Sequence, residues 1–259
     1  MGKSKPSPPA CGGAAAPPPP APADGGAPPG GAAPAGGAAG AGAAAPSCPS
    51  STKDVNNRVT ETITNGNPAS WNGTYSWDSK YKLAIANCTA TVTVRIKVTG
   101  TITDAQKAAW KSAIETKWNN KVYFCCSGCN CPAGIPCTIV VQYVDSGEDY
   151  EVTAQTPGAD EGGRAGLGGT TSMTGWGVDD TVDVTHEFGH MLGNPEEYFT
   201  TNGTDYSEGG TKQPFRDPSG GIMNNPANNP LPRNYDPIRS QVEQSLGGGA
   251  SCSTRAVGT

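Results

Sequence analysis

The sequence predicts an α+β domain preceded by an unstructured arm. Three observations support this fold class. The first fifty residues are almost all Pro, Ala and Gly, strand-like apolar patterns fill residues 81–144, and helical spacing appears at residues 103–118, 179–193 and 236–247. Strands come first, two helices lie among them, and the C-terminal part is rich in loops, which is the order typical of an α+β fold.

Residues 1–52 are expected to form a disordered arm. From Pro6 to Pro49 the chain has no aromatic residue and no alternation of apolar and polar positions. Such a stretch cannot bury enough apolar surface to offset the entropy lost on ordering. We therefore place one domain at residues 53–247 and a flexible tail at residues 248–259.

Charge and hydropathy exclude two classes of partner. The net charge is −5 and no basic run extends beyond Lys3 and Lys5, so we expect no nucleic-acid binding. No window approaches eighteen consecutive apolar residues, so we expect no membrane span. The two lysines are not followed by the apolar segment of a Sec signal peptide. We expect a monomer.

The first elements follow a polar lead-in at residues 51–70. In residues 81–100, YKLAIANCTATVTVRIKVTG, apolar and polar side chains alternate, which predicts a half-buried strand. In residues 103–118 the period changes: Thr103 and Gln106 have the spacing of a capping box. Apolar residues then recur every fourth position, which predicts a helix that buries Trp110, Ile114 and Trp118.

The later elements are a strand at residues 121–124, an interior strand at residues 138–144, and two helices. The segment DDTVDVTHEFGHMLG is expected to be a helix with Asp179 or Asp180 as N-cap and Gly193 as its left-handed stop. The glycine-rich stretch before it ends in a possible short strand. The last helix begins at Asp236 with Pro237 in its first turn and ends at Gly247.

Nine cysteines indicate an oxidising compartment. Five of them crowd into residues 125–137, which predicts a loop held by disulfides. Cys126 and Cys129 also have the spacing of a zinc knuckle, but no second such pair accompanies them, so disulfides are favoured. An odd count leaves at least one thiol unpaired, and we expect it to be Cys11. Together with the missing signal peptide, this suggests secretion or export by a non-Sec route, with a cytoplasmic location as the alternative.

The only two histidines lie four residues apart, at His186 and His190, around Glu187. Residues four apart on a helix differ by about 40° in azimuth and ~6 Å along the axis, so both imidazoles can chelate one ion. Glu187 stands beside the same face and can hold a water without itself ligating. This is the HExxH arrangement.

A third ligand must come from beyond the helix. If the helix continued, Glu196 would point away, and Glu197 would align with the histidines but lie ~10 Å further along, against metal bonds near ~2 Å. Gly193 tolerates the left-handed conformation that ends a helix, and Pro195 discourages helix at Asn194. A turn at Gly193 brings Glu196 back toward the ion and completes a His₂Glu set.

This stretch resembles the extended motif of the metzincin clan of zinc metalloendopeptidases, HExxHxxGxxH or HExxHxxGxxD. His186, Glu187, His190 and Gly193 match position for position. Glu196 occupies the place of the third ligand, where a glutamate departs from the clan pattern by one methylene relative to aspartate.

A second segment carries the same resemblance. GGIMNNP, at residues 220–226, looks like the metzincin Met-turn, with Met223 beneath the metal, and LPRNY leads into a C-terminal helix as in that clan. Over residues 90–246 the resemblance implies a twisted mixed sheet with two helices, up to residue 193, over a smaller loop-rich part, residues 194–247, that ends in a helix. It also implies Zn²⁺ as cofactor and a protein or peptide as substrate.

The resemblance implies endopeptidase chemistry in which Glu187 is the general base. An anionic Glu196 makes the ion less electrophilic than a third imidazole would, so a further donor to the oxyanion is expected. The candidates are Tyr198, Tyr206 and Tyr235, with Tyr235 favoured because it follows the Met-turn. In the clan the substrate lies antiparallel to an edge strand, which maps here within residues 166–176.

Other interpretations stay open. Glu208 keeps a thermolysin-like ligand set possible, with the third ligand on a later helix, in an exported effector or toxin protease delivered by a secretion apparatus; SEGGTKQP around it is a poor helix. Asp205 and Asp217 are read as solvated loop acids. A non-catalytic metal-binding module is the alternative from another class, although such a site has no use for Glu187.

Overall fold

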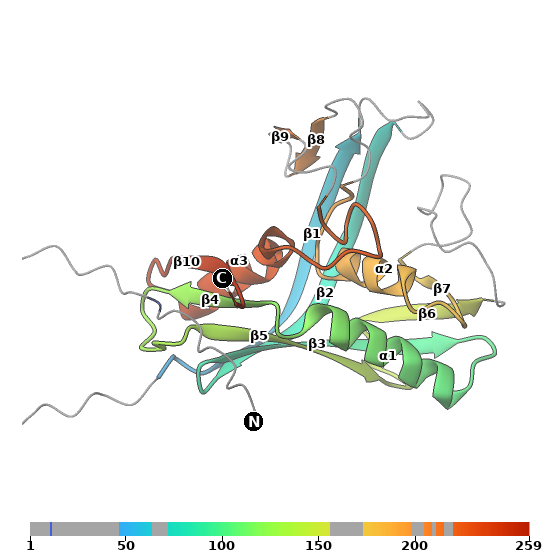
Figure 1. Cartoon of the computed structure of the whole chain (residues 1–259), viewed down its shortest axis with the longest axis horizontal. Helices are drawn as coiled ribbons and strands as arrows, with labels where there is room; N and C mark the ends of the chain where they lie inside the picture. Colours follow the sequence, from blue (N-terminus) through green and yellow to red (C-terminus); the bar gives the residue numbers. More distant parts are fainter. Residues whose placement is uncertain are drawn as a thin grey trace, which may run out of the picture.

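A mixed sheet forms the centre of the molecule in the computed structural model, which describes residues 11, 47–63, 72–155, 173–197, 205–208, 211–214 and 220–258, with backbone alone at 205–208 and 211–214 (Figure 1). The described strands are β1 Ser51–Ile63, β2 Gly73–Ala86, β3 Thr89–Thr99, β4 Val122–Cys126, β5 Ile135–Tyr143, β6 Tyr150–Gln155, β7 Gly175–Gly177, β8 Asp205–Glu208, β9 Thr211–Pro214 and β10 Cys252–Ala256. Their order is β10-β4-β5-β3-β2-β1-β8-β9, with β6 paired to β3 and β7 paired to β6. β3 is parallel to β5 and β6, and antiparallel to β2. The α+β class and the mixed sheet are thus as predicted.

Three described helices pack on this sheet: α1 Asp104–Trp118, α2 Asp183–Met191 and α3 Asp236–Leu246, the last preceded by a 3₁₀ turn, η2, at Pro232–Tyr235. The α1 capping box is present, because Gln106 N donates to Thr103 Oγ1 at 3.3 Å and Thr103 N donates to Gln106 Oε1 at 2.9 Å. Trp110, Ile114 and Trp118 are fully buried, as the four-residue spacing predicts. This buried face of α1 also binds α2, because Trp118 Nε1 donates to the carbonyl of Thr185 at 2.9 Å.

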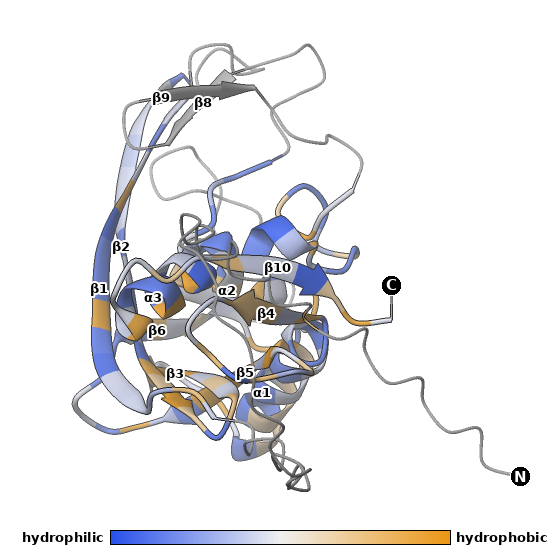
Figure 2. Ribbon diagram, turned by 90° about the vertical axis from the view of Figure 1, so that its left-hand side faces the viewer, coloured by the Kyte–Doolittle hydropathy of each residue, from blue (hydrophilic) through white to orange (hydrophobic). Residues whose placement is uncertain are grey.

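The polar segment at residues 51–70 is not merely a lead-in. Residues 51–63 form β1, which pairs antiparallel with β2 along its whole length, from Ser51 opposite Ile85 to Ile63 opposite Gly73. β1 and β2 project beyond the rest of the sheet (Figure 1), and their ribbons are mostly hydrophilic (Figure 2). Among residues 51–62 of β1, whose side chains the structure describes, only Val55, Val59 and Glu61 are buried, which is too few to produce an apolar alternation.

Residues 81–100 form two strands rather than one. β2 ends at Ala86 and β3 begins at Thr89, and the two residues between them, Asn87 and Cys88, have φ of 48° and 55°. Such a two-residue turn with positive φ at both positions is typical of a tight hairpin. The buried positions change from odd numbers in β2 to even numbers in β3, because Ile85 lies opposite Ala90 on the same face. This change from odd to even buried positions is the sequence signal of the turn.

The C-terminal segment is not a flexible tail. Residues 252–256 form β10, which pairs antiparallel with β4, and Cys252 is bonded to Cys126. The boundary of the arm also differs from the prediction, because residues 47–50 are already described and β1 starts at Ser51. Composition alone does not reveal where the ordered domain begins or ends, because strand pairing and disulfides order the chain at both places.

Four disulfides hold the chain, as the cysteine count predicts: Cys11 to Cys125, Cys48 to Cys129, Cys88 to Cys131 and Cys126 to Cys252. The expectation that Cys11 is the unpaired thiol was wrong. The free cysteine is Cys137, which is buried on the core face of β5. The disulfides are consistent with an extracellular location. Within the described residues, no helix has the length and apolarity that crossing a bilayer requires.

Candidate metal centre

Helix α2 carries both histidines inside the core. It begins at Asp183, four residues after the first N-cap proposed from the sequence, although Asp180 Oδ1 does accept the backbone N–H of Val182 and of Asp183. Every residue from Val184 to Met191 is buried. A helix that is buried all round depends on its neighbours for its polar groups.

Side chains from the sheet, together with Asn194, hold the C-terminal end of α2. The last carbonyl groups of a helix have no partner within it, and here those of Gly189, His190 and Met191 accept bonds from outside. The donors are Asn194 Nδ2 to Gly189 O at 3.1 Å, Trp77 Nε1 to His190 O at 2.8 Å, and Ser79 Oγ and Tyr150 Oη to Met191 O at 2.8 and 3.0 Å. β2 and β6 therefore fix the end of the helix to which His190 belongs.

The chain turns back at Gly193, as its spacing predicts. Its φ is +98°, a conformation that residues with a Cβ rarely adopt. A Cβ there would also lie 3.3 Å from Ser79 Oγ and 3.2 Å from Pro237 Cβ. The glycine thus satisfies both the turn and the close packing that return residues 194–197 toward α2.

The turn places Glu196 against both imidazole rings. Glu196 Oε2 lies 3.2 Å from His186 Nε2, and Glu196 Oε1 lies 3.1 Å from His190 Nε2. The exposed fractions of the three residues are 2%, 4% and 7% for Glu196, His186 and His190. The ring centroids are 5.1 Å apart with an interplanar angle of 84°. Three potential ligands from α2 and the following segment therefore meet in one buried place.

The opposite nitrogen of each ring faces a backbone carbonyl. His186 Nδ1 lies 2.7 Å from Ile222 O, and His190 Nδ1 lies 2.8 Å from Asn194 O. A carbonyl only accepts, so each Nδ1 carries a hydrogen, and in a neutral ring Nε2 then presents its lone pair. Two lone pairs and a carboxylate that point at one another require a positive charge between them, and such carbonyl partners orient metal-ligating histidines. The donor set fits a metal ion.

The pKa shifts show the same need for positive charge. Burial lowers the pKa of His186, but the charge of Glu196 and its hydrogen bond raise it by more. The resulting pKa is about 9, above the ordinary value of 6.5. Burial raises the pKa of Glu196, but the two histidines bring it well below its usual value. Without a cation, a proton on the His186 imidazole supplies positive charge beside the carboxylate.

Glu187 lies beside these ligands. Its carboxylate, His186 and His190 each offer a ligand atom, all within 4.8 Å of one another, in a buried group that can hold a metal ion. Burial raises the pKa of Glu187, and the two neighbouring histidines oppose this rise. Its carboxylate is therefore easier to protonate than one in water.

Met223 lies directly under α2. A Cβ added to Gly189 would come within 2.3 Å of Met223 Sδ, so the sulfur occupies the space that this glycine leaves open between the two histidines of the helix. The turn that carries Met223 is closed by Asn224 N and Asn225 N, which both donate to Gly221 O at 3.0 Å. The same turn supplies the Ile222 carbonyl that orients His186.

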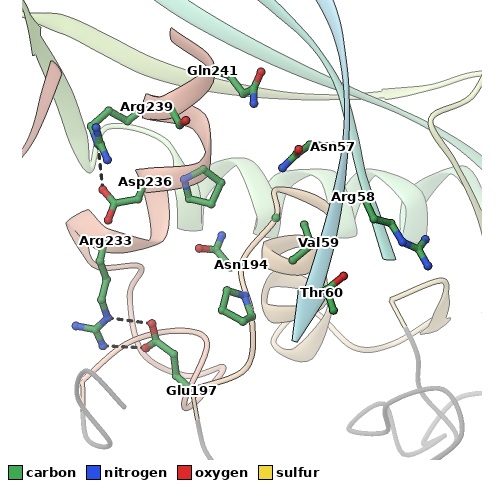
Figure 3. Close-up of a pocket in the computed structure, with 14 residues that line it drawn as sticks. Asn57, Arg58, Val59, Thr60, Asn194, Glu197, Arg233, Asp236, Arg239 and Gln241 are labelled. Carbon is green, nitrogen blue, oxygen red and sulfur yellow. Dashed lines mark hydrogen bonds and ion pairs between the residues drawn. The ribbon is translucent and has the colours of Figure 1, made fainter. Parts of the chain in front are cut away.

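Two buried acids that the sequence did not reveal as site residues hold the segment of Glu196. Glu197 forms a two-point ion pair with Arg233, at 2.9 and 2.8 Å, and its backbone N–H donates to Met223 O at 2.9 Å (Figure 3). Glu61 of β1 is fully buried, and its Oε2 accepts the N–H of Glu196 at 3.5 Å. The pair of adjacent acids was the only sequence signal for Glu197, and Glu61 had none within its polar strand.

Tyr235 is not placed to stabilise an oxyanion, so this prediction was wrong. Its hydroxyl donates to Trp118 O, its ring packs on Trp118 with centroids 5.5 Å apart, and it is fully buried. Burial raises its pKa above the ordinary value. Of the other two candidates, Tyr198 lies outside the described residues and Tyr206 is described only by its backbone in β8.

The thermolysin-like alternative places Glu208 on a later helix, and the structure has no helix at that position. Residues 205–208 form strand β8, which pairs with β9. Asp205 belongs to the same strand, and Asp217 lies outside the described residues.

A polar cavity of about 460 Å³ lies behind the segment of Glu196 (Figure 3). Its walls come from β1, from residues 193–197 and from η2 and α3, and they include Asn57, Thr60, Asn194 and Gln241. Each arginine labelled in Figure 3 is bound to an acid: Arg58 to Asp78, Arg233 to Glu197, and Arg239 to Asp236 and Glu243. The arginines that line this cavity are therefore paired with acids.

Comparison with known proteins identifies no relative of this chain. No family model, no curated protein and no solved structure matches it. The metal centre is therefore inferred from its own donor atoms: two imidazoles oriented by carbonyls, and a carboxylate that faces both of them.

Proposed function

We propose that this protein is a zinc-dependent endopeptidase. The observation that carries the proposal is that, in a buried site, one carboxylate oxygen of Glu196 lies 3.2 Å from His186 Nε2 and the other lies 3.1 Å from His190 Nε2. The resemblance of residues 186–196 and 220–226 to the metzincin motifs supports the same class of enzyme.

The donor set favours zinc over other common ions. Calcium and magnesium prefer sites made of oxygen ligands, whereas two imidazoles with one carboxylate form a recognised catalytic zinc set. When bound in such a site, zinc lowers the pKa of a water molecule to about 7 and polarises a carbonyl group. His186, His190 and Glu196 would hold the ion.

Glu187 supplies the proton transfer. Its carboxylate lies beside the ligand atoms, and its burial raises its pKa toward the range where a general base works best near neutral pH. It accepts the proton of the attacking water and passes that proton to the leaving amine. A purely structural metal site has no use for an acid at this position.

The anionic Glu196 makes a further donor to the oxyanion necessary. Tyr235 cannot supply it, because its hydroxyl is bound to Trp118 O. Tyr198 and Tyr206 remain as candidates among the tyrosines near the motif in sequence.

The substrate is a protein or peptide that lies extended along β7. Among the described strands, β7 pairs only with β6, and it precedes α2 by five residues. A peptide that adds to the other edge of β7 gains main-chain hydrogen bonds that do not depend on its side chains.

The enzyme acts after export. Four disulfides favour an oxidising compartment, and the Pro/Ala/Gly-rich arm suits a chain carried by a secretion apparatus. Deletion of residues 12–46, which leaves Cys11 and Cys48 in place, should reduce export in the producing cell while cleavage by the purified protein is retained.

Substitution of Glu187 tests the proposal. Glu187→Gln should keep one zinc per chain and lose about 10²–10⁴-fold in the rate of cleavage of an unfolded protein such as reduced casein. The matched control is Glu151→Gln, which changes an exposed glutamate of β6 and should cleave like the wild type. Equal activity of Glu187→Gln and wild type, or zinc-loaded wild type that cleaves none of a panel of unfolded proteins, would favour a non-catalytic metal-binding module instead.

A further inference from the structure

A second group of metal-ligating side chains lies at the β4–β5 turn, at the end of these strands remote from α2 (Figure 1). The sulfur atoms of Cys48, Cys129 and Cys131 are all within 4.8 Å of one another. Cys48 is bonded to Cys129, and Cys88 is bonded to Cys131. Four sulfur atoms from two neighbouring disulfides therefore form one cluster, which we call the four-cysteine cluster.

We propose that in a reducing environment the four-cysteine cluster opens its two disulfides and binds one zinc ion through four thiolates. Each disulfide bond breaks as it takes two electrons and two protons from a dithiol, which closes to its own disulfide. Zn²⁺ then displaces the four thiol protons and forms four Zn–S bonds, so the site gains the ion and releases four protons. This site is independent of the proposed peptidase centre.

The spacing of the sulfurs suits tetrahedral zinc. Zn–S bonds of about 2.3 Å put the four sulfurs of such a site about 3.8 Å apart. Three of the sulfurs already lie within 4.8 Å of one another, and the fourth, on Cys88, is bonded to one of these. Once the S–S bonds are broken, each sulfur needs to move only about an ångström or two, which a change of side-chain rotamer provides.

The backbone keeps the four cysteines together without the disulfides. Ser47 and Asn130 exchange two hydrogen bonds of 2.8 Å, which hold residues 47–48 against residues 129–131. Cys88 occupies the turn of the β2–β3 hairpin, whose register is set by strand pairing up to Ala86 and Thr89. Three separate segments are thus positioned by hydrogen bonds that reduction leaves intact.

The surroundings also favour a bound ion over four free thiols. Cys131 is 7% exposed, and the other three cysteines are half-buried and packed against the hydrophobic core. A structural zinc site of four cysteines is closed to water and contributes directly to folding. In the reduced chain, zinc would replace the disulfides as the link between residues 48, 88 and 129–131, so that the chain can fold before it meets an oxidant.

Metal stoichiometry under reducing conditions tests this proposal. The full-length protein, reduced without denaturant by a water-soluble phosphine and loaded with Co²⁺, should bind two ions per chain, against one for the oxidised protein. The second ion should add the intense sulfur-to-cobalt charge-transfer absorption of a thiolate site, which the His₂Glu site lacks. Reoxidation should release that ion.

Cysteine variants assign the second ion to the cluster. Cys88→Ser and Cys129→Ser should each weaken the second site at least tenfold, whereas the paired variant Cys126→Ser/Cys252→Ser, which removes a neighbouring disulfide, should retain it. Far-UV circular dichroism of the reduced, zinc-loaded protein should match that of the oxidised protein. A reduced chain that binds no more ions than the oxidised chain, a reduced chain that has lost its fold, or a thiolate absorption unchanged in Cys88→Ser and Cys129→Ser would each overturn the proposal.

Discussion

The guanidinium of Arg233 donates two hydrogen bonds to the carboxylate of Glu197, at 2.9 and 2.8 Å, and Asn234 Nδ2 donates a third at 3.2 Å. Glu197 directly follows Glu196, so this ion pair fixes the segment that carries the third candidate ligand. The Arg233 and Glu197 side chains are 19% and 10% exposed, so the pair is largely shielded from water.

Arg233→Met should therefore destabilise the protein and weaken metal binding. Removing one partner of a buried ion pair leaves an uncompensated charge and costs about 3–5 kcal/mol in unfolding free energy. Urea unfolding measures this loss, and zinc titration measures the affinity. The control Arg58→Met removes an exposed partner of Asp78 and should cost about 1 kcal/mol or less. Equal losses in the two variants would contradict the role given to Arg233.

Gly189 and Met223 should be strongly coupled in stability. Gly189→Ala puts a methyl group 2.3 Å from Met223 Sδ and 3.1 Å from Trp118 Cζ2, and such overpacking costs about 1–3 kcal/mol. Met223→Ala alone leaves a cavity worth about 2–5 kcal/mol. Because the new methyl group fills part of that cavity, the double variant should lose less unfolding free energy than the sum of the single losses. Additive losses in a double-mutant cycle would show that the two residues do not touch.

The thiol of Cys137 should be inert until the protein unfolds. Burial raises its pKa to about 12, and it is the one cysteine of nine that is not in a disulfide. A thiol reagent at pH 8 should find no reactive thiol in the native protein and one per chain in guanidinium. More than one thiol in the denatured chain would mean that a disulfide is missing, and rapid labelling of the native chain would mean that Cys137 is exposed.

The metal-free protein should lose stability as the pH rises from about 6.5 to about 9. The pKa of His186 is raised from 6.5 to about 9 in the folded chain, so its protonation stabilises the fold fully below the unfolded pKa, and this contribution is lost as the pH passes the folded value. The lowered pKa of Glu196 stabilises the fold above the unfolded pKa of a glutamate, and this contribution is lost only as the pH falls into the acid range, outside this pH window. Unfolding in the presence of a chelator measures this slope. Saturating zinc should abolish it, because the ion replaces the proton, and an identical slope with zinc would contradict the assignment.

Local signals in the sequence predicted the helices and the return of Glu196 toward the two histidines better than they predicted the sheet. Thr103, Gln106 and the tryptophan spacing define α1 because capping and a buried stripe are properties of one segment. Gly193 predicts the turn after His190 for the same reason. By contrast, β1 and β10 are ordered by pairing with β2 and β4, so their own residues carry little apolar pattern.

Sequence reasoning also missed interactions that depend on the assembled fold. Tyr235 follows the Met223 turn in sequence, yet its hydroxyl is taken by Trp118 O of α1. Glu61 and Glu197 contact the segment of Glu196 only because β1 and η2 pack around it. Cys11 looked unpaired in its Pro/Ala/Gly-rich surroundings, but a disulfide needs a partner close in space, not in sequence.

The coordination of zinc in the purified protein tests the central claim most directly. Metal analysis with X-ray absorption spectroscopy, followed by a crystal structure of the zinc-loaded protein, should show one ion bound by His186 Nε2, His190 Nε2 and a carboxylate oxygen of Glu196, at about 2.0–2.2 Å. Glu196→Ala should lose this ion while Glu187→Gln keeps it. A protein that binds no zinc, or a zinc ion bound with Glu196 outside its coordination sphere, would contradict the account.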